Sequence, residues 1–390
     1  MPIVNRIAEY HQEMTGWRQH LHQHPELAYE EVQTSAFVSA KLREFGCDEV
    51  HDGIGKTGVV GVIRGQKPGS AIGLRADMDA LPIHERTSKP WASTVPGKMH
   101  ACGHDGHTTM LLGAARYLAE TRNFAGTVYV IFQPAEEGFA GAKAMIEDGL
   151  FERFPQERIF GLHNWPDLPT GQFAIRTGPA MAAADRFTIV LTGLGCHGAM
   201  PHQGRDPVLA ACVVVQSLQG IVSRQIDPID NAVLSVTRIA GGDAFNVVPD
   251  KVELWGTVRT YKPETQDFIE RRMGEVVAGI AAAHGIEGTI AYDRGYPATV
   301  NSAEESRIGA DVAASIVGSE NVHREHPPCM GAEDFAFMLQ EKPGSYIWMG
   351  QGGGPEGRVC HSPFYDFNDE ALPVGTSYWV QLVERTLPRG

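Results

Sequence analysis

The sequence Cys-Gly-His-Asp-Gly-His at residues 102–107 combines one thiol, two imidazoles and one carboxylate. Thiolate and imidazole bind borderline-soft divalent metals, and the two glycines let the backbone turn tightly enough to aim them. Apolar residues recur at helical spacing through 108–120, so the stretch is expected at or just before the start of a helix. It predicts part of a metal site that other segments must complete.

Length and charge limit the classes of protein to which the chain can belong. A chain of 390 residues is too long for one ordinary compact core, which favours two domains. The 33 basic and 47 acidic residues give a net charge of −14, which argues against a nucleic-acid partner. The sequence has no apolar run of signal-peptide or membrane-span length, so we expect a cytoplasmic protein without a membrane partner. Most of the six scattered cysteines are expected to be reduced thiols.

Polar side chains of the catalytic kind follow the ends of several predicted strands. One buried strand is expected at 71–75, joined to the strand before it by a turn at 67–69, and others at 126–132 and 159–162. The residues in question are Asp79, the pair Glu136 and Glu137, His163 and, in a later loop, His361. In open α/β sheets, active-site groups gather at the carboxyl ends of the strands. The alternating strands and helices predict an α/β catalytic domain with a mostly parallel sheet flanked by helices.

The pattern changes in the middle of the chain. Residues 181–295 read as β-α-β-β-α-β, the order of a ferredoxin-like unit, with helices at 206–226 and 263–284. We therefore expect a catalytic domain made of 1–180 and 296–390, with an inserted α+β domain at 181–295.

Five groups from different loops are the expected metal ligands: Cys102, His104, Glu137, His163 and His361. Three imidazoles, one carboxylate and one thiolate are too many for one tetrahedral site with an open position. They suit two divalent ions about 3.5–4 Å apart. Asp79 is expected to accept the free N–H of His104 and so fix its tautomer.

Glu136 remains beside the expected ligand Glu137. One glutamate can bind metal while the other acts as general base on the metal-bound water, which is the chemistry of metal-assisted hydrolysis. Two alternatives stay open. Each group taken alone could be a solvated loop residue, and Cys102 could be a nucleophile with a histidine partner. A thiol hydrolase, however, would not require the glutamate pair or the two distant histidines.

Several segments carry a resemblance to a known family, and they lie at 18–27, 74–82, 99–107, 133–138, 161–163, 246–249 and 331–335. With them the sequence resembles the M20 metallopeptidase family, in particular its amidohydrolase branch of hippurate hydrolases, N-acyl-amino-acid deacylases and plant auxin-conjugate hydrolases. The resemblance implies the same five metal ligands, with Glu136 as the catalytic base. The wider family often has a ligand histidine where this chain has Asp77, and here Cys102 and His104 take the ligand roles.

The resemblance also implies roles for the inserted domain as a lid and as a dimerisation surface, hence a homodimer or homotetramer. His197 is expected to polarise the scissile carbonyl and stabilise the oxyanion, with Asn246 as a helper. Arg259 is expected to hold the substrate carboxylate in a bidentate contact, a structural role being the alternative.

The expected activity is hydrolysis of the amide bond of small N-acyl amino acids, such as hippurate-like or N-acetyl substrates, with two divalent ions per subunit. Ligand softness favours Zn²⁺, and the family often uses Mn²⁺, Zn²⁺, Co²⁺ or Ni²⁺. The alternatives are a dipeptidase or carboxypeptidase of the same family and a non-catalytic metal- and peptide-binding protein. The intact Glu136–Glu137 pair argues against the last.

Overall fold

The computed structural model describes residues 4–353 and 359–389. The chain forms two compact units. Unit 1 comprises Met1–Ala180, Thr299–Pro327 and Asp334–Gly390, and unit 2 comprises Met181–Ala298 and Pro328–Glu333. The inserted segment expected from the sequence is 181–295.

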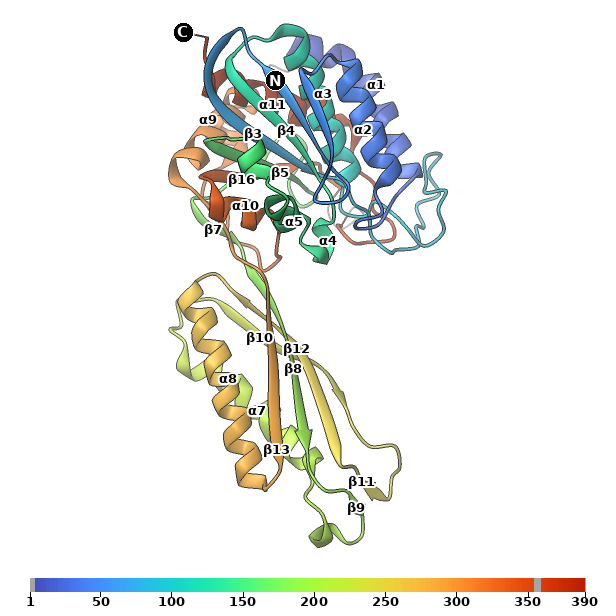
Figure 1. Cartoon of the computed structure of the whole chain (residues 1–390), viewed down its shortest axis with the longest axis vertical. Helices are drawn as coiled ribbons and strands as arrows, with labels where there is room; N and C mark the ends of the chain where they lie inside the picture. The colour runs from blue at the N-terminus through green and yellow to red at the C-terminus, as the bar shows by residue number, and fades with distance from the viewer. Residues whose placement is uncertain (1–3, 354–358, 390) are drawn as a thin grey trace. The chain divides into compact units, whose positions relative to one another are not determined.

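Unit 1 is built on an eight-stranded sheet with the order β1-β2-β4-β3-β5-β16-β6-β15. The strands β4, β3, β5 and β16 of this sheet are labelled in Figure 1. Its strands are β1 (Glu49–Ile54), β2 (Gly58–Arg64), β3 (Lys67–Asp77), β4 (Ala125–Gln133), β5 (Arg158–Trp165), β6 (Phe173–Ala174), β15 (Val322–His323) and β16 (Gly344–Gly350). The four central strands β4, β3, β5 and β16 are parallel, and β6 is parallel to β15. The other pairs are antiparallel. The prediction of a mostly parallel sheet is therefore confirmed, whereas the turn expected at 67–69 is wrong, because these residues belong to β3.

Parallel register brings the carboxyl ends of the central strands to one edge of the sheet. Asp77 at the end of β3 lies opposite Gln133 at the end of β4. His163 near the end of β5 lies opposite Trp348 of β16. The loops that follow these ends carry the predicted site residues, so the topology alone gathers them.

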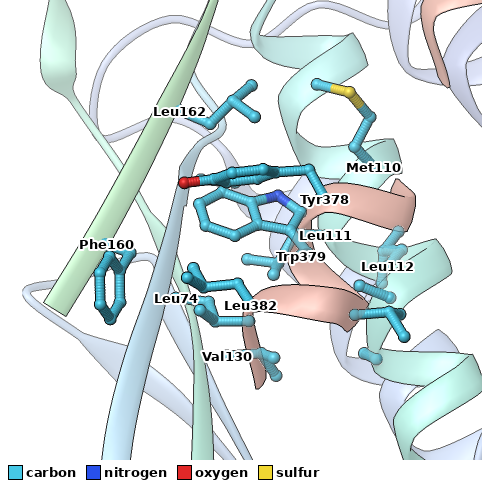
Figure 2. Packing of buried hydrophobic residues seen from close by; sticks show 14 of the residues in the cluster. Leu74, Met110, Leu111, Leu112, Val130, Phe160, Leu162, Tyr378, Trp379 and Leu382 are labelled. Carbon is cyan, nitrogen blue, oxygen red and sulfur yellow. The ribbon is translucent and has the colours of Figure 1, made fainter. Parts of the chain in front are cut away.

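Helices cover this sheet: α1 (Asn5–Gln23), α2 (Val32–Glu44), α3 (His104–Thr121), α4 (Glu136–Phe139), α5 (Gly141–Glu147), α6 (Leu150–Arg153), α9 (Ala303–Val317), α10 (Phe335–Glu341) and α11 (Leu372–Thr386). Figure 2 shows side chains of α3 and α11 packed against the central strands. The labelled residues are Leu74, Val130, Phe160 and Leu162 from strands and Met110, Leu111, Leu112, Tyr378, Trp379 and Leu382 from the two helices. Burial of each large apolar side chain contributes roughly 1.5–3 kcal/mol, so this core holds the start of α3 firmly against the sheet.

Unit 2 contains a four-stranded antiparallel sheet with the order β10-β12-β8-β13. Its elements follow the chain as β8 (Ala183–Thr192), α7 (Pro207–Gln225), β10 (Ala232–Ala240), β12 (Lys251–Thr260), α8 (Pro263–His284) and β13 (Glu287–Tyr296). Both helices contribute buried residues to one core with the sheet. This is the predicted ferredoxin-like unit. The short strands β9 (Cys196–His197) and β11 (Val247–Val248) form a separate pair, as do β7 (Gly178–Met181) and β14 (Thr299–Asn301).

Helix α7 is long and apolar enough to cross a membrane, judged by length and composition alone. The Asp206 side chain caps its first turn by accepting from the N–H groups of Val208 and Leu209. A third of the apolar window, 33%, is buried inside the structure, and core residues of α7 such as Val214 and Leu218 pack within unit 2. A helix that packs in a protein core passes the same test, so the observation is weak support for a membrane span.

Candidate metal centre

The loop that carries Cys102 and His104 turns at Gly103, whose φ of +99° lies in the left-handed region. His104 is the first residue of α3 and is buried. Its Nδ1–H donates to the main-chain oxygen of Asp79 at 2.9 Å, with the Asp79 carboxylate 3.3 Å away. Its Nε2 is buried and has no hydrogen-bond partner among the described residues. Buried polar atoms normally have a partner, so this nitrogen points to a ligand such as a metal ion.

A first group of possible metal ligands joins Cys102, His104 and His163, whose donor atoms all lie within 4.8 Å of one another. The Cys102 Sγ is 3.4 Å from the Nε2 of His163. The Nδ1–H of His163 donates to the main-chain oxygen of Asn164 at 2.6 Å. That bond fixes the tautomer of His163 and leaves the Nε2 lone pair on the side of the thiol.

A second group joins Cys102, Glu137 and His361, again within 4.8 Å. The His361 Nε2 lies 3.1 Å from the Glu137 Oε1. The backbone of His361 is in the left-handed region (φ +67°), and its N–H donates to the main-chain oxygen of Ala101 at 2.7 Å. The five predicted ligands thus fall into two overlapping groups that share Cys102. Thiolate, imidazole and carboxylate donors are those that bind Zn²⁺ and related ions.

The loop that carries Glu136 and Glu137 is held by the Asp79 carboxylate. Asp79 accepts the N–H groups of Glu136 and Glu137, one on each oxygen and both at 3.0 Å. Ala135 before them has a left-handed backbone (φ +54°), and its N–H donates to the buried Glu31 at 2.8 Å. Both glutamates lie within 4.8 Å of the His104 donor atom. The expected contact of Asp79 with His104 runs mainly through its main-chain oxygen, while its carboxylate positions the glutamate pair.

The electrostatics of the centre disfavour a nucleophilic thiol. The neighbouring Cys360 thiol, burial and nearby carboxylates raise the pKa of Cys102 well above its usual value. Burial lowers the pKa of His163 well below its usual value, so this imidazole is neutral. Reactive cysteines instead have lowered pKa values in electropositive surroundings. A divalent cation displaces the thiol proton on binding, so the same environment suits a metal ligand.

Asp77 and His107 are two residues of the site for which the sequence analysis predicted no contacts. With His104 they form a further group within 4.8 Å. The Asp77 carboxylate, however, already accepts from the Nη1 of Arg75 at 2.8 Å and from the Nδ1–H of His107 at 2.6 Å. Asp77 and His107 are therefore engaged with protein partners and orient the loop. The position of Asp77 at the end of β3 was the available signal in the sequence.

Unit 2 holds the remaining predicted site residues. His197 is exposed on β9, which pairs with β11. The adjacent Gly198 N–H donates to the main-chain oxygen of Asn246 at 2.7 Å, so the two predicted residues are close along the paired strands. The Ala199 N–H donates to the His197 Nδ1 at 3.1 Å, which leaves the N–H of a neutral imidazole on Nε2.

Arg259 is not near this pair of strands. It lies half-buried on β12, which begins at Lys251, three residues after β11 ends. Arg259 is eight residues beyond Lys251 and thus roughly 25 Å farther along the strand. Its Nη1 donates to the Thr257 hydroxyl and to the main-chain oxygen of Val258, and burial lowers its pKa. Within unit 2 the structure therefore brings His197 and Asn246 together but leaves Arg259 apart, with protein partners of its own.

Comparison with known proteins finds relatives along nearly the whole chain. Residues 73–385 match the family model described as peptidase family M20/M25/M40. Hippurate hydrolase from Campylobacter jejuni is 41% identical over 99% of this chain and 100% of its own. N-acetylcysteine deacetylase from Bacillus subtilis is 40% identical over 96% of both chains. A Bacillus subtilis crystal structure described as a dinuclear metal binding peptidase from the M20 family has a TM-score of 0.85 and 38% identity, covering 97% of this chain and 99% of that one. The chain therefore belongs to peptidase family M20/M25/M40 and, within it, to the amidohydrolase branch of hydrolytic enzymes.

Proposed function

We propose that this protein is a metal-dependent amidohydrolase that cleaves N-acyl amino acids to a carboxylic acid and a free amino acid. The observation that carries the proposal is the pair of ligand groups that share Cys102, one of which contains Glu137, with Glu136 next to them. In this proposal Cys102, His104, Glu137, His163 and His361 hold two divalent ions. When bound, these ions lower the pKa of a coordinated water and polarise the amide carbonyl.

Glu136 acts as the general base in this proposal. It takes a proton from the attacking water and delivers it to the leaving amine nitrogen, so that one carboxylate serves both halves of the reaction. Its main-chain N–H is held by Asp79, and its side chain is only 7% exposed. A base on a fixed loop with little solvent around it is suited to transferring a proton between two positions of the substrate.

Residues of unit 2 contribute to substrate binding in this proposal. His197 donates its Nε2–H to the oxyanion that develops on the carbonyl oxygen, and Asn246 supports it. The bond from Ala199 to the Nδ1 favours the required tautomer. Arg259 is proposed to bind the substrate carboxylate, although its bonds to Thr257 and Val258 favour the alternative structural role.

Two relatives suggest the first substrates to try. The names hippurate hydrolase and N-acetylcysteine deacetylase, at 41% and 40% identity, both describe removal of an acyl group from an amino acid. Dipeptidase or carboxypeptidase activity is the alternative, since a relative named thermostable carboxypeptidase 1 is 38% identical. Zn²⁺ and Mn²⁺ are the ions to test first, followed by Co²⁺ and Ni²⁺. We further propose a cytoplasmic homodimer or homotetramer without nucleic-acid or membrane partners.

The experiment compares hippurate, N-acetyl amino acids and dipeptides on one metal-loaded preparation, with release of the free amino acid as the measurement. The proposal predicts the highest kcat/KM for an N-acyl amino acid. Faster cleavage of dipeptides would transfer the assignment to the peptidase alternative. A parallel preparation of Glu136→Gln shows whether the measured activity belongs to this protein.

A further inference from the structure

Asn164 directly follows the proposed ligand His163 on β5 and is fully buried. Its main-chain oxygen accepts the Nδ1–H of His163 at 2.6 Å. Its side chain turns to other loops of the centre. The residue therefore contacts one ligand through its backbone and has an amide free to bind elsewhere.

The side-chain oxygen of Asn164 reaches the start of α3. It lies 2.6 Å from the Nε2 of His107, and the main-chain N–H of Asn164 donates to that same nitrogen at 3.0 Å. The other ring nitrogen of His107 is bonded to Asp77. His107 stands three residues after the proposed ligand His104 in the first turn of α3. Asn164 and Asp77 thus contact the two ring nitrogens of His107. These contacts hold the first turn of α3, which also carries His104.

The side-chain nitrogen of Asn164 reaches the loop that carries His361. It donates to the Tyr365 hydroxyl at 3.0 Å and lies 4.0 Å from the Cys360 Sγ. Tyr365 is fully buried, and its hydroxyl donates in turn to the Oε1 of Gln351 at 3.3 Å. Because His361 has a left-handed backbone, its loop needs such anchoring to keep one conformation.

The side chains of Asn164 and Tyr365 also pack directly against Gly103. A Cβ atom at Gly103 would lie 2.2 Å from the Asn164 Oδ1 and 2.5 Å from the Tyr365 hydroxyl. The turn between Cys102 and His104 therefore rests directly on this pair of side chains. Asn164 therefore contacts the three segments that carry the proposed ligands: the turn of Cys102 and His104, the end of β5 with His163, and the loop of His361.

We propose that Asn164 is a positioning residue that sets the spacing of the metal ligands by joining the loops of Cys102 and His104, of His163 and of His361. The inference rests on the proposed metal centre. Its physical basis is that hydrogen-bonded neighbours of metal ligands fix ligand orientation, and their loss typically weakens metal binding by about 10–100-fold.

The test uses Co²⁺ binding to the metal-free full-length protein, with wild type, Asn164→Leu, Tyr365→Phe and Gln156→Leu compared. Leucine matches asparagine in shape and removes both polar atoms. Gln156 is the matched control, because it is a buried amide ahead of β5 whose side chain has no hydrogen-bond partner among the described residues. Affinity is measured by competition with a chelator, and the thiolate-to-cobalt charge-transfer absorption of Cys102 is recorded at saturation.

We expect Asn164→Leu to weaken Co²⁺ binding by about 10–100-fold and to alter the charge-transfer absorption. Tyr365→Phe should change both in the same direction by less, and Gln156→Leu should match wild type. If Asn164→Leu does not fold, Tyr365→Phe, which removes one hydroxyl, decides the question. Wild-type affinity and spectrum in folded Asn164→Leu, or in Tyr365→Phe when only that variant folds, would overturn the positioning role alone. Failure of the wild type to bind Co²⁺ would overturn the proposed metal centre as well.

Discussion

Glu136 and Glu137 are neighbours with different expected tasks, and one substitution separates them. Glu136→Gln keeps the size of the side chain and removes its capacity to take a proton. We expect kcat to fall by roughly 10²–10⁴ while bound metal stays at the wild-type level, because the proposed ligand is Glu137. Turnover and metal content are measured on the same sample.

The exposed Glu147→Gln is the control for removal of a carboxylate from unit 1, and it should leave both quantities unchanged. A near-normal kcat in Glu136→Gln would remove Glu136 from the role of base. Loss of metal from that variant would instead make it a ligand.

His197 lies in unit 2 with its Nε2 free to donate, which fits the stabilisation of an oxyanion. We expect His197→Ala to lower kcat by roughly 10²–10³, the usual effect of losing one such donor, with bound metal unchanged. His202→Ala is the control, since it removes another exposed histidine from the following turn. Reduced metal content in His197→Ala would contradict the assignment and make His197 a ligand.

The proposed ligands were the part of the site most accessible to sequence reasoning. Glu137 and His163 follow buried apolar segments, where a polar side chain needs an explanation, and Cys102 stands with His104 in a short stretch rich in metal-binding side chains. The role of Asn164 could not be predicted, because an asparagine beside a histidine has no distinctive pattern. Its partners, His107 and Tyr365, are distant in sequence and meet it only in the folded chain.

Gly103 is the residue at which the loop of Cys102 turns into α3. A substitution there tests whether this turn needs a glycine. Gly103→Ala places a Cβ on a left-handed backbone and against Asn164 and Tyr365. We expect weaker metal binding and a lower free energy of unfolding, measured by denaturant titration.

Gly46→Ala is the matched control, because Gly46 has a φ of +80° but nothing within 4 Å of the added Cβ. It should show only the left-handed cost of about 1–2 kcal/mol. Equal losses of stability and unchanged metal binding in the two variants would show that the contact with Asn164 has no effect.

An ion pair joins α1 to α3 behind the metal centre. The buried His22 lies 2.7 Å from Asp105, and although burial opposes its charge, bonds to Asp105 and Glu85 raise the pKa of His22 to about 9. Because the folded protein binds this proton more tightly than the unfolded chain, the charged His22 stabilises the fold fully at pH values below its unfolded-state pKa of about 6.5. This contribution is lost as the pH rises through 9. The loss is roughly 3 kcal/mol, at about 1.4 kcal/mol for each tenfold change in proton affinity.

Denaturant titrations between pH 6 and 10 check this dependence. The free energy of unfolding should fall less over this range in His22→Gln than in wild type. His24→Gln, which alters a half-buried histidine bonded to a main-chain oxygen, should keep the wild-type profile. Identical profiles for wild type and His22→Gln would contradict the charged pair.

Elements with strong periodicity were predictable, and short ones were not. The sequence predicts a helix at 263–284, and this range matches α8. The two-residue strands β6 and β15 were not predicted, since two residues carry no periodicity. They exist because neighbouring strands of the large sheet offer them hydrogen bonds.

At the scale of the whole molecule, the two units differ in how far their strand order could be predicted. The strand order of unit 2 follows from its β-α-β-β-α-β sequence, because this connectivity has one common antiparallel solution. The order of the large sheet could not be derived in this way, since β16 from the end of the chain inserts beside β5. Tertiary packing decides that neighbour, and with it the place of the loop that carries His361.

The most direct test of the proposed two-metal amidohydrolase is the rate of glycine release from hippurate by the full-length protein, measured after thorough chelation and again after a divalent ion is added. The account predicts that chelation abolishes the activity and that Zn²⁺, Mn²⁺ or a related ion restores it, with two ions bound per chain. Activity that survives complete chelation would contradict the account.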